Sequence, residues 1–147
     1  MNVTVRDAAP NELQAVLDLY RHLHAHDEPL KPQRAEAVWR EILDSPGFRC
    51  FVAEADGRLV ASCVLAIIPN LTRGARPYGL VENVITHPEY RRRGIGTMVL
   101  RRAMDVAWER GCYKVMLLTG REDAHGFYEQ VGFRRGVKTG FVATPNA

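Results

Sequence analysis

The residues with the clearest chemical potential form a basic, glycine-containing turn, Arg91-Arg92-Arg93-Gly94-Ile95-Gly96-Thr97. It follows an apolar stretch, residues 79–86, and precedes an amphipathic one, residues 98–110. A strand that enters such a turn and a helix that leaves it direct backbone N–H groups and the positive helix end at one point. Glycine lets the backbone approach an anion closely, and three arginines attract a polyanion over a longer range. The pattern predicts a phosphate site, although a solvated basic turn that only starts a helix has the same composition.

The stretches before the turn predict a strand, two helices and a hairpin. Apolar residues alternate or recur at helical spacing in each of them, and Asp56-Gly57 is a hairpin turn signal. The nearly continuous apolar character of the second hairpin strand predicts burial on both faces. The predicted strands are residues 2–6, 48–54 and 59–68, and the predicted helices are residues 10–24 and 33–43.

The remaining stretches predict a loop at residues 69–77, strands at 79–86 and 113–119, helices at 98–110 and 122–131, and one or two edge strands within 133–141. The resulting order, β-α-α-β-β-β-α-β-α-β(-β), predicts an α/β fold with a mixed sheet and helices on both faces. The phosphate-type turn lacks G-x-G-x-x-G and follows the fourth strand. A Rossmann dinucleotide site is therefore not expected.

Length and composition favour a single cytoplasmic domain over residues 1–147. The chain is 46% hydrophobic and 25% charged, and it has neither an apolar run of membrane-spanning length nor the apolar core of a signal peptide. Cys50, Cys63 and Cys112 lack metal-ligand spacing, so reduced core thiols are expected. No metal site is expected at His22, His24 and His26, since they point in different directions at a helix end.

Charge is divided unevenly along the chain. Residues 1–75 carry a net charge of −2, whereas residues 76–147, which contain the turn, carry +5. Nothing in the chain has the pattern of a nucleic-acid-binding module, so a small polyanion is the expected ligand of the basic half.

Two motifs and the order of the elements resemble the GNAT superfamily of N-acetyltransferases. The first is the R/Q-x-x-G-x-G/A turn, here Arg91-x-x-Gly94-x-Gly96, preceded by Ile85-Thr86-His87-Pro88-Glu89-Tyr90. The second is F-Y-x-x-x-G-F, here residues 127–133. The resemblance covers essentially the whole chain and implies a mostly antiparallel sheet of GNAT type whose fourth and fifth strands separate around a thioester.

The resemblance implies acetyl-CoA as the donor substrate. Backbone N–H groups of the turn would surround its pyrophosphate, and Val84 to Thr86 would offer backbone hydrogen bonds to the pantetheine arm and the acetyl carbonyl. Where the family often has Asn, this chain has Arg121, which could approach a CoA phosphate or stay in solvent. The implied donor-binding residues are Val84, Ile85, Thr86, Arg91, Arg92, Arg93, Gly94, Ile95, Gly96, Thr97, Arg121 and Tyr128.

Tyr128 and Glu82 are the predicted catalytic residues. Attack of an amine on a thioester expels a thiolate, and a tyrosine with a pKa near 10 can stabilise or protonate it; alternatively, Tyr128 only packs its helix against the sheet. Glu82 is the only acidic residue of the apolar strand before the turn. It could accept the proton of the amine or hold the ammonium group, or it could pair with Arg73 or Arg76.

The acceptor is predicted to be a small primary amine, attacked directly in a ternary complex. Residues 123–128 are similar to aminoalkylphosphonate acetyltransferases, and Glu82-Asn83 with residues 111–114 are similar to glucosamine-6-phosphate acetyltransferases. Arg73, Arg76 and Tyr78 could bind the anion of such an acceptor, so Arg73, Arg76, Tyr78, Glu82 and Asn83 are the predicted substrate-binding residues. A protein N-terminal or lysine acetyltransferase and a non-catalytic acyl-CoA-binding domain are the alternatives. Edge strands within 133–141 suggest a homodimer, and no nucleic-acid or membrane partner is expected.

Overall fold

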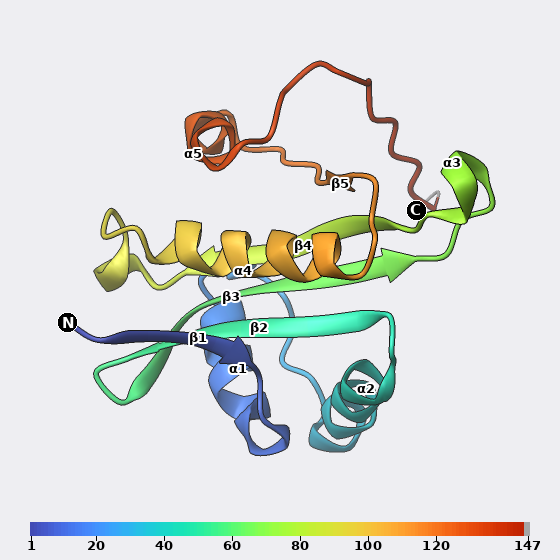
Figure 1. Cartoon of the computed structure of the whole chain (residues 1–147). Coiled ribbons are helices and arrows are strands. Elements are labelled where there is room, and N and C mark those ends of the chain that lie inside the picture. Colours follow the sequence, from blue (N-terminus) through green and yellow to red (C-terminus); the bar gives the residue numbers. More distant parts are fainter. Residues whose placement is uncertain (146–147) are drawn as a thin grey trace.

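A five-stranded sheet in the order β1-β2-β3-β4-β5 organises the chain, as seen in a computed structural model that describes residues 1–145 (Figure 1). Strands β1 to β4 pair antiparallel with their neighbours, whereas β5 pairs parallel with β4. The predicted α/β class and mostly antiparallel sheet are therefore confirmed. The strands are β1 (Val3–Asp7), β2 (Phe48–Ala55), β3 (Arg58–Ile68), β4 (Tyr78–Thr86) and β5 (Val115–Met116).

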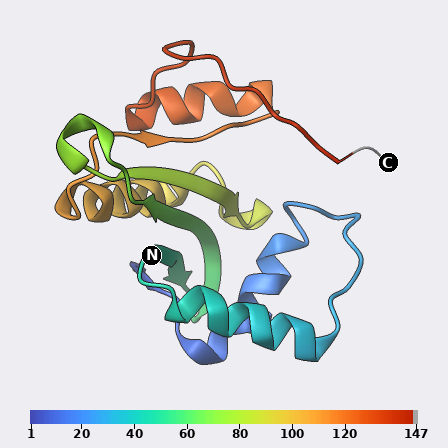
Figure 2. The ribbon, with the colours of Figure 1, turned by 90° about the vertical axis from the view of Figure 1, so that its right-hand side faces the viewer.

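Helices lie on both faces of this sheet. Figures 1 and 2 show α1 and α2 on one face and α4 on the other, with α5 beyond α4. The α-helices are α1 (Leu13–Tyr20), α2 (Pro32–Asp44), α3 (Thr72–Ala75), α4 (Ile95–Glu109) and α5 (His125–Val131). The short 3-10 helices are η1 (Pro10–Glu12), η2 (Pro88–Tyr90) and η3 (Glu122–Ala124).

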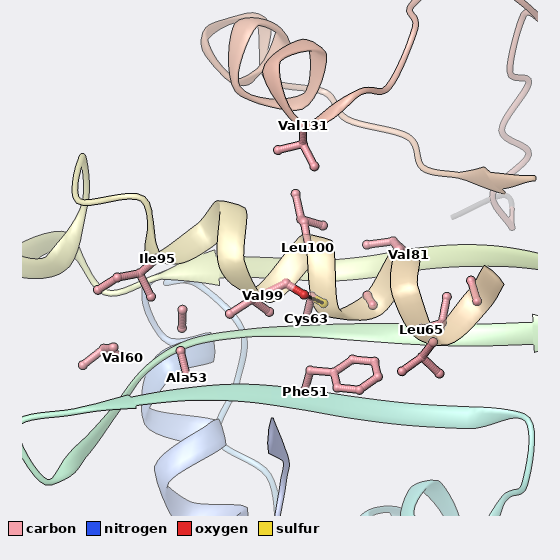
Figure 3. Packing of buried hydrophobic residues seen from close by; sticks show 14 of the residues in the cluster. Phe51, Ala53, Val60, Cys63, Leu65, Val81, Ile95, Val99, Leu100 and Val131 are labelled. Carbon is pink, nitrogen blue, oxygen red and sulfur yellow. Dashed lines mark hydrogen bonds between the residues drawn. The ribbon is translucent and has the colours of Figure 1, made fainter. Parts of the chain in front are cut away.

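Strand β3 contributes to a hydrophobic core on each face, as its continuous apolar sequence predicted. Cys63 and Leu65 point toward α4 and pack with Phe51, Val99 and Leu100 (Figure 3). The intervening Val64 belongs to the second core, where α1 and α2 contribute Val16, Leu19 and Trp39. Cys50, Cys63 and Cys112 are buried free thiols, in agreement with the expected core role.

Three predicted elements differ in extent. The first helix ends at Tyr20 rather than at residue 24, and only Val115 and Met116 of the predicted strand 113–119 pair with β4. The loop 69–77 contains the short helix α3. No helix within residues 1–145 is long and apolar enough to cross a membrane.

The predicted edge strands within 133–141 are wrong, because no residue of that stretch pairs with the sheet. Gly136 adopts a left-handed conformation (φ 78°), and Gly140 packs so closely on Leu118 that a Cβ there would come within 2.6 Å of it. The stretch therefore follows the 115–119 segment as irregular chain. The homodimer was predicted from these edge strands. Without them the homodimer remains an untested prediction.

Candidate active site

The predicted phosphate turn is a left-handed connection between η2 and α4. Gly94 (φ 79°) and Arg92 (φ 62°) both have positive φ, and Gly94 is the N-terminal cap of the 15-residue helix α4. The first N–H groups of a helix have no partner within it, and no side chain caps them here. These free N–H groups, at the positive end of a long helix, can donate hydrogen bonds to a pyrophosphate.

The three arginines of the turn have three different environments. The guanidinium of Arg91 donates a hydrogen bond through Nε to the carbonyl oxygen of Thr86 at 3.1 Å. Arg93 lies over the ring of Tyr90 at 5.2 Å. Arg92 is exposed and makes no side-chain hydrogen bond or ion pair within the described residues. Arg92 is therefore the arginine free to meet an anion.

The two glycines of the turn are required for different reasons. A Cβ on Gly94 would meet nothing within 4 Å, so its positive φ is what favours glycine there. A Cβ on Gly96 would lie 3.1 Å from both the ring of Phe127 and the hydroxyl oxygen of Thr86. Glycine at position 96 therefore lets α5 pack onto the first turn of α4, a reason that the local sequence does not reveal.

Strands β4 and β5 separate soon after they pair. Their register contains only Gly79 opposite Val115 and Leu80 opposite Met116. Beyond Leu80 the edge of β4 that faces away from β3 has no strand partner in the described part of the chain. Val84 to Thr86 lie on this open edge, although the carbonyl of Thr86 already accepts from Arg91. The separation leaves room along the edge for backbone hydrogen bonds to a ligand.

A β-bulge in β4 presents Glu82 and Asn83 to solvent. The register with β3 shifts between Ser62 and Val64, and Asn83 adopts a left-handed conformation (φ 52°). Both residues are exposed, and no ion pair in residues 1–145 contains Glu82. The alternative that Glu82 pairs with Arg73 or Arg76 is not found.

Tyr20 at the end of α1 reaches the bulge from the core. Burial raises the pKa of its hydroxyl, whereas hydrogen bonding to Asn83 and Ser62 partly offsets this rise. In the sequence Tyr20 recurs with Leu13 and Val16 at helical spacing, a pattern that predicts only a core residue. No local signal distinguishes a tyrosine that also contacts the site.

Tyr128 is half-buried on α5, between the rings of Phe127 and Phe133 at centroid distances of 5.0 and 6.1 Å. Burial raises its pKa. The guanidinium of Arg121 opposes this effect, whereas Cys63 and the Glu82 carboxylate add to it. Because its pKa lies above the ordinary value of 10, the phenol stays protonated over a wide range of pH.

Arg121 forms a two-point ion pair with Asp123, through Nε at 3.2 Å and Nη2 at 2.9 Å. Both side chains are exposed. The guanidinium is therefore neither simply solvated nor free, and an incoming phosphate would have to compete with Asp123.

Arg73, Arg76 and Tyr78 do come together, but at the start of β4, whereas the bulge lies in the middle of the strand. Both guanidinium groups lie 5.7 Å from the ring of Tyr113, which stands edge-to-face with Tyr78. Glu82 is four positions after Tyr78 along the strand, or about 13 Å at roughly 3.3 Å per residue. The predicted substrate-binding residues thus form two groups rather than one.

A hollow of about 360 Å³ lies elsewhere, between α1 and the β2–β3 hairpin. His22 and His87 line it, with ring centroids 4.7 Å apart, and burial lowers the pKa of His87. None of the predicted catalytic or donor-binding residues lines this hollow.

The family is decided by comparison with known proteins. Residues 13–133 match the family model "Acetyltransferase (GNAT) family". The chain belongs to the GNAT family. The resemblance drawn from residues 85–96 and 127–133 is therefore confirmed.

Individual GNAT relatives differ in how much of the chain they match. A glucosamine 6-phosphate N-acetyltransferase of Trypanosoma brucei brucei is 38% identical over 86 residues, which is 58% of either chain. This match spans little more than half the length of that relative. A thialysine N-epsilon-acetyltransferase of Sus scrofa is 29% identical over 147 residues, covering 90% of this chain and 85% of its own.

The GNAT fold is matched over nearly the whole chain by a solved structure. A putative acetyltransferase from Agrobacterium tumefaciens str. C58 has a TM-score of 0.92 at 46% identity, covering 97% of this chain and 99% of its own.

Proposed function

We propose that this GNAT protein is an N-acetyltransferase that transfers the acetyl group of acetyl-CoA to a primary amine of a small molecule. The observation that carries the proposal is the position of Tyr128 and Glu82. The Glu82 carboxylate contributes to the raised pKa of Tyr128, and Glu82 is exposed on β4, whose edge is open beyond Leu80 and leads to the phosphate turn. These observations support Tyr128 as the acid and Glu82 as the base or ammonium ligand.

The donor would be held mainly by backbone groups. The uncapped N–H groups of Ile95 to Thr97 and the exposed Arg92 suit the pyrophosphate. The open β4 edge from Val84 to Thr86 suits the amide-rich pantetheine arm, which would complete the strand's missing hydrogen bonds. Arg121 would contribute only by leaving Asp123.

The reaction would be a direct attack in a ternary complex. The amine nitrogen forms a bond to the thioester carbonyl carbon, the carbon–sulfur bond breaks, and the electron pair leaves with sulfur. Tyr128 donates its phenolic proton to this sulfur, and its raised pKa keeps the proton available. Glu82 accepts the proton of the amine, directly or through water, or holds the ammonium form before attack.

The acceptor class rests on the site and on the names of the relatives. Glucosamine 6-phosphate and thialysine, in the names of two matched proteins, are small amines that also carry an anionic group. Glu82 is exposed and forms no ion pair within residues 1–145, so a small cationic amine could reach it without displacing one there.

The deciding experiment measures thiol release from acetyl-CoA with a panel of amines: hexosamine 6-phosphate, thialysine, aminoalkylphosphonates, neutral alkylamines and lysine-containing peptides. We expect release with a small amine and much less with the Glu82→Gln variant. The Arg101→Gln variant, which changes an exposed arginine of α4, is the matched control. Acetyl-CoA binding without release from any amine would overturn the proposal, and release with peptides alone would overturn the small-molecule assignment.

A further inference from the structure

Alternate side chains of β4 define a partly exposed strip on the α1–α2 face of the sheet, with half-buried Tyr78 and Leu80 and exposed Glu82. A Cβ on Gly79 would contact Ala107 of α4, and Val81 belongs to the core beneath α4. Because successive residues of a strand point to opposite faces, Tyr78, Leu80 and Glu82 face the other way. The pairing of Glu82 with Val64, a member of the α1–α2 core, agrees with this assignment.

Three cations gather at one end of this strip around two tyrosines. Arg73 and Arg76 lie over the ring of Tyr113, and the ammonium group of Lys114 lies 5.4 Å from the rings of both Tyr78 and Tyr113. None of the three cations takes part in an ion pair within residues 1–145. We name Arg73, Arg76, Tyr78, Tyr113 and Lys114 the cationic cluster.

The backbone that presents the two arginines is strained. Arg73, Gly74 and Ala75 have consecutive positive φ angles of 57°, 70° and 60°. Residues other than glycine rarely adopt this conformation, because the Cβ atom then crowds the following carbonyl oxygen. The turn is held by a hydrogen bond from Nε of Arg76 to the carbonyl of Arg73 at 2.9 Å. The strained turn thus holds two like charges, Arg73 and Arg76, over the same ring.

The opposite end of the strip carries the opposite charge. Glu82 lies about 13 Å from Tyr78 along the strand. Between them the surface is apolar, with half-buried Leu80 and, directly across on β5, Met116 at 40% exposure. The strip therefore has a carboxylate at the reaction end, an apolar middle and unpaired cations at the far end.

We propose that the acceptor is a two-ended molecule, with an ammonium group that binds at Glu82 and an anionic group, such as phosphonate, phosphate or carboxylate, that binds the cationic cluster. A flexible, mostly apolar chain on the order of 10 Å joins the two groups, to span the strip between Tyr78 and Glu82. Polycationic amines bind poorly, since their second charge faces Arg73, Arg76 and Lys114. This inference rests on the proposed function and specifies its substrate class.

The test compares ω-aminoalkylphosphonates of increasing chain length with n-alkylamines and α,ω-diamines of equal length, by thiol release. We expect the phosphonate to exceed the alkylamine in kcat/KM by about tenfold or more at the best length, and the diamine to be the poorest. The ratio of kcat/KM for the phosphonate to kcat/KM for the alkylamine should fall toward one in the double variant Arg73→Gln/Arg76→Gln. It should also fall in the separate variant Lys114→Met, which changes a different segment. Arg101→Gln should keep the ratio. Turnover with no preference for the phosphonate at any length would overturn the inference while leaving the proposed function intact.

Calorimetric binding of the same phosphonates provides a readout that does not need turnover. Binding with an optimum chain length that is lost in the Arg73→Gln/Arg76→Gln variant would support the two-ended site even if no thiol is released, in which case only the proposed function fails. Equal binding by the wild type and both cluster variants would overturn the inference. Thermal unfolding of each variant checks that the strained turn is folded.

Discussion

The ring of Phe127 in α5 packs against Gly96 in the first turn of α4. A Cβ at position 96 would come within 3.1 Å of the Cζ atom of Phe127, closer than side chains normally approach. This contact therefore joins the first turn of α4, where the uncapped N–H groups lie, to the helix that carries Tyr128. The packing of Phe127 on Gly96 therefore affects both the predicted phosphate turn and the helix of the predicted acid.

The Gly96→Ala variant should lower the free energy of unfolding by about 1–3 kcal/mol, because an added methyl group overpacks this contact. Urea unfolding measures the change. Phe127→Leu combined with Gly96→Ala should recover part of the loss, since the smaller side chain leaves room. If Gly96→Ala is as stable as the wild type, Phe127 yields easily and the constraint does not exist.

The Tyr128→Phe variant should lower kcat by about 100-fold while leaving the KM for acetyl-CoA within about twofold, because only the proton donor is removed. Steady-state kinetics on the substrate found by thiol release check this. Burial holds the pKa of Tyr128 above its ordinary value of 10. The wild-type rate should therefore show no decline from phenol ionisation below about pH 10. Unchanged turnover in Tyr128→Phe would leave Tyr128 with a packing role only.

The Arg92→Gln variant should weaken acetyl-CoA binding by about two- to fivefold, and more strongly at low salt, because an exposed charge near a phosphate is screened by ions. Equilibrium titration at two salt concentrations measures this. Arg93→Gln is the internal comparison: Arg93 lies over Tyr90, so its loss should affect stability more than binding. Equal losses of affinity in both variants would contradict the separate roles of the two arginines.

The Glu12→Gln variant should reduce stability near neutral pH but not in acid. Glu12 accepts hydrogen bonds from Arg6 at 2.7 and 2.9 Å and from the N–H of Ala9 at 2.7 Å. The Arg6 guanidinium holds the pKa of Glu12 below its ordinary value of 4.5, against the effect of burial. A lowered folded pKa means that this stabilisation is present above pH 4.5 and is lost as the pH falls through the folded value.

At neutral pH the loss in Glu12→Gln should be about 1–3 kcal/mol, and the variant and wild type should converge as the pH falls through the lowered pKa of Glu12. Chemical unfolding over a pH series measures it. Glu36→Gln, which changes an exposed carboxylate of α2, should leave the pH dependence unaltered. A constant difference between Glu12→Gln and wild type at every pH would mean that the carboxylate charge is not responsible.

The local sequence by itself determined the family, the glycine turn that starts α4 and most of the elements. Residues 91–97 combine a glycine at a left-handed position with the start of a helix, and these are properties of neighbouring residues. The burial of β3 on both faces could also be predicted, because a nearly continuous apolar run can bury its side chains only between two cores. Glu82 and Tyr128 were selected by residue type within recognisable motifs.

The tertiary structure decided what depends on contacts between distant segments. The bulge at Asn83 is a matter of register between β3 and β4, and the need for glycine at position 96 arises from the approach of α5. Tyr20, Tyr113 and Lys114 acquire their positions only when α1, α3 and β5 pack around β4. The stretch 133–141 has strand-like composition but does not pair, because a strand needs a partner in register and not only suitable residues.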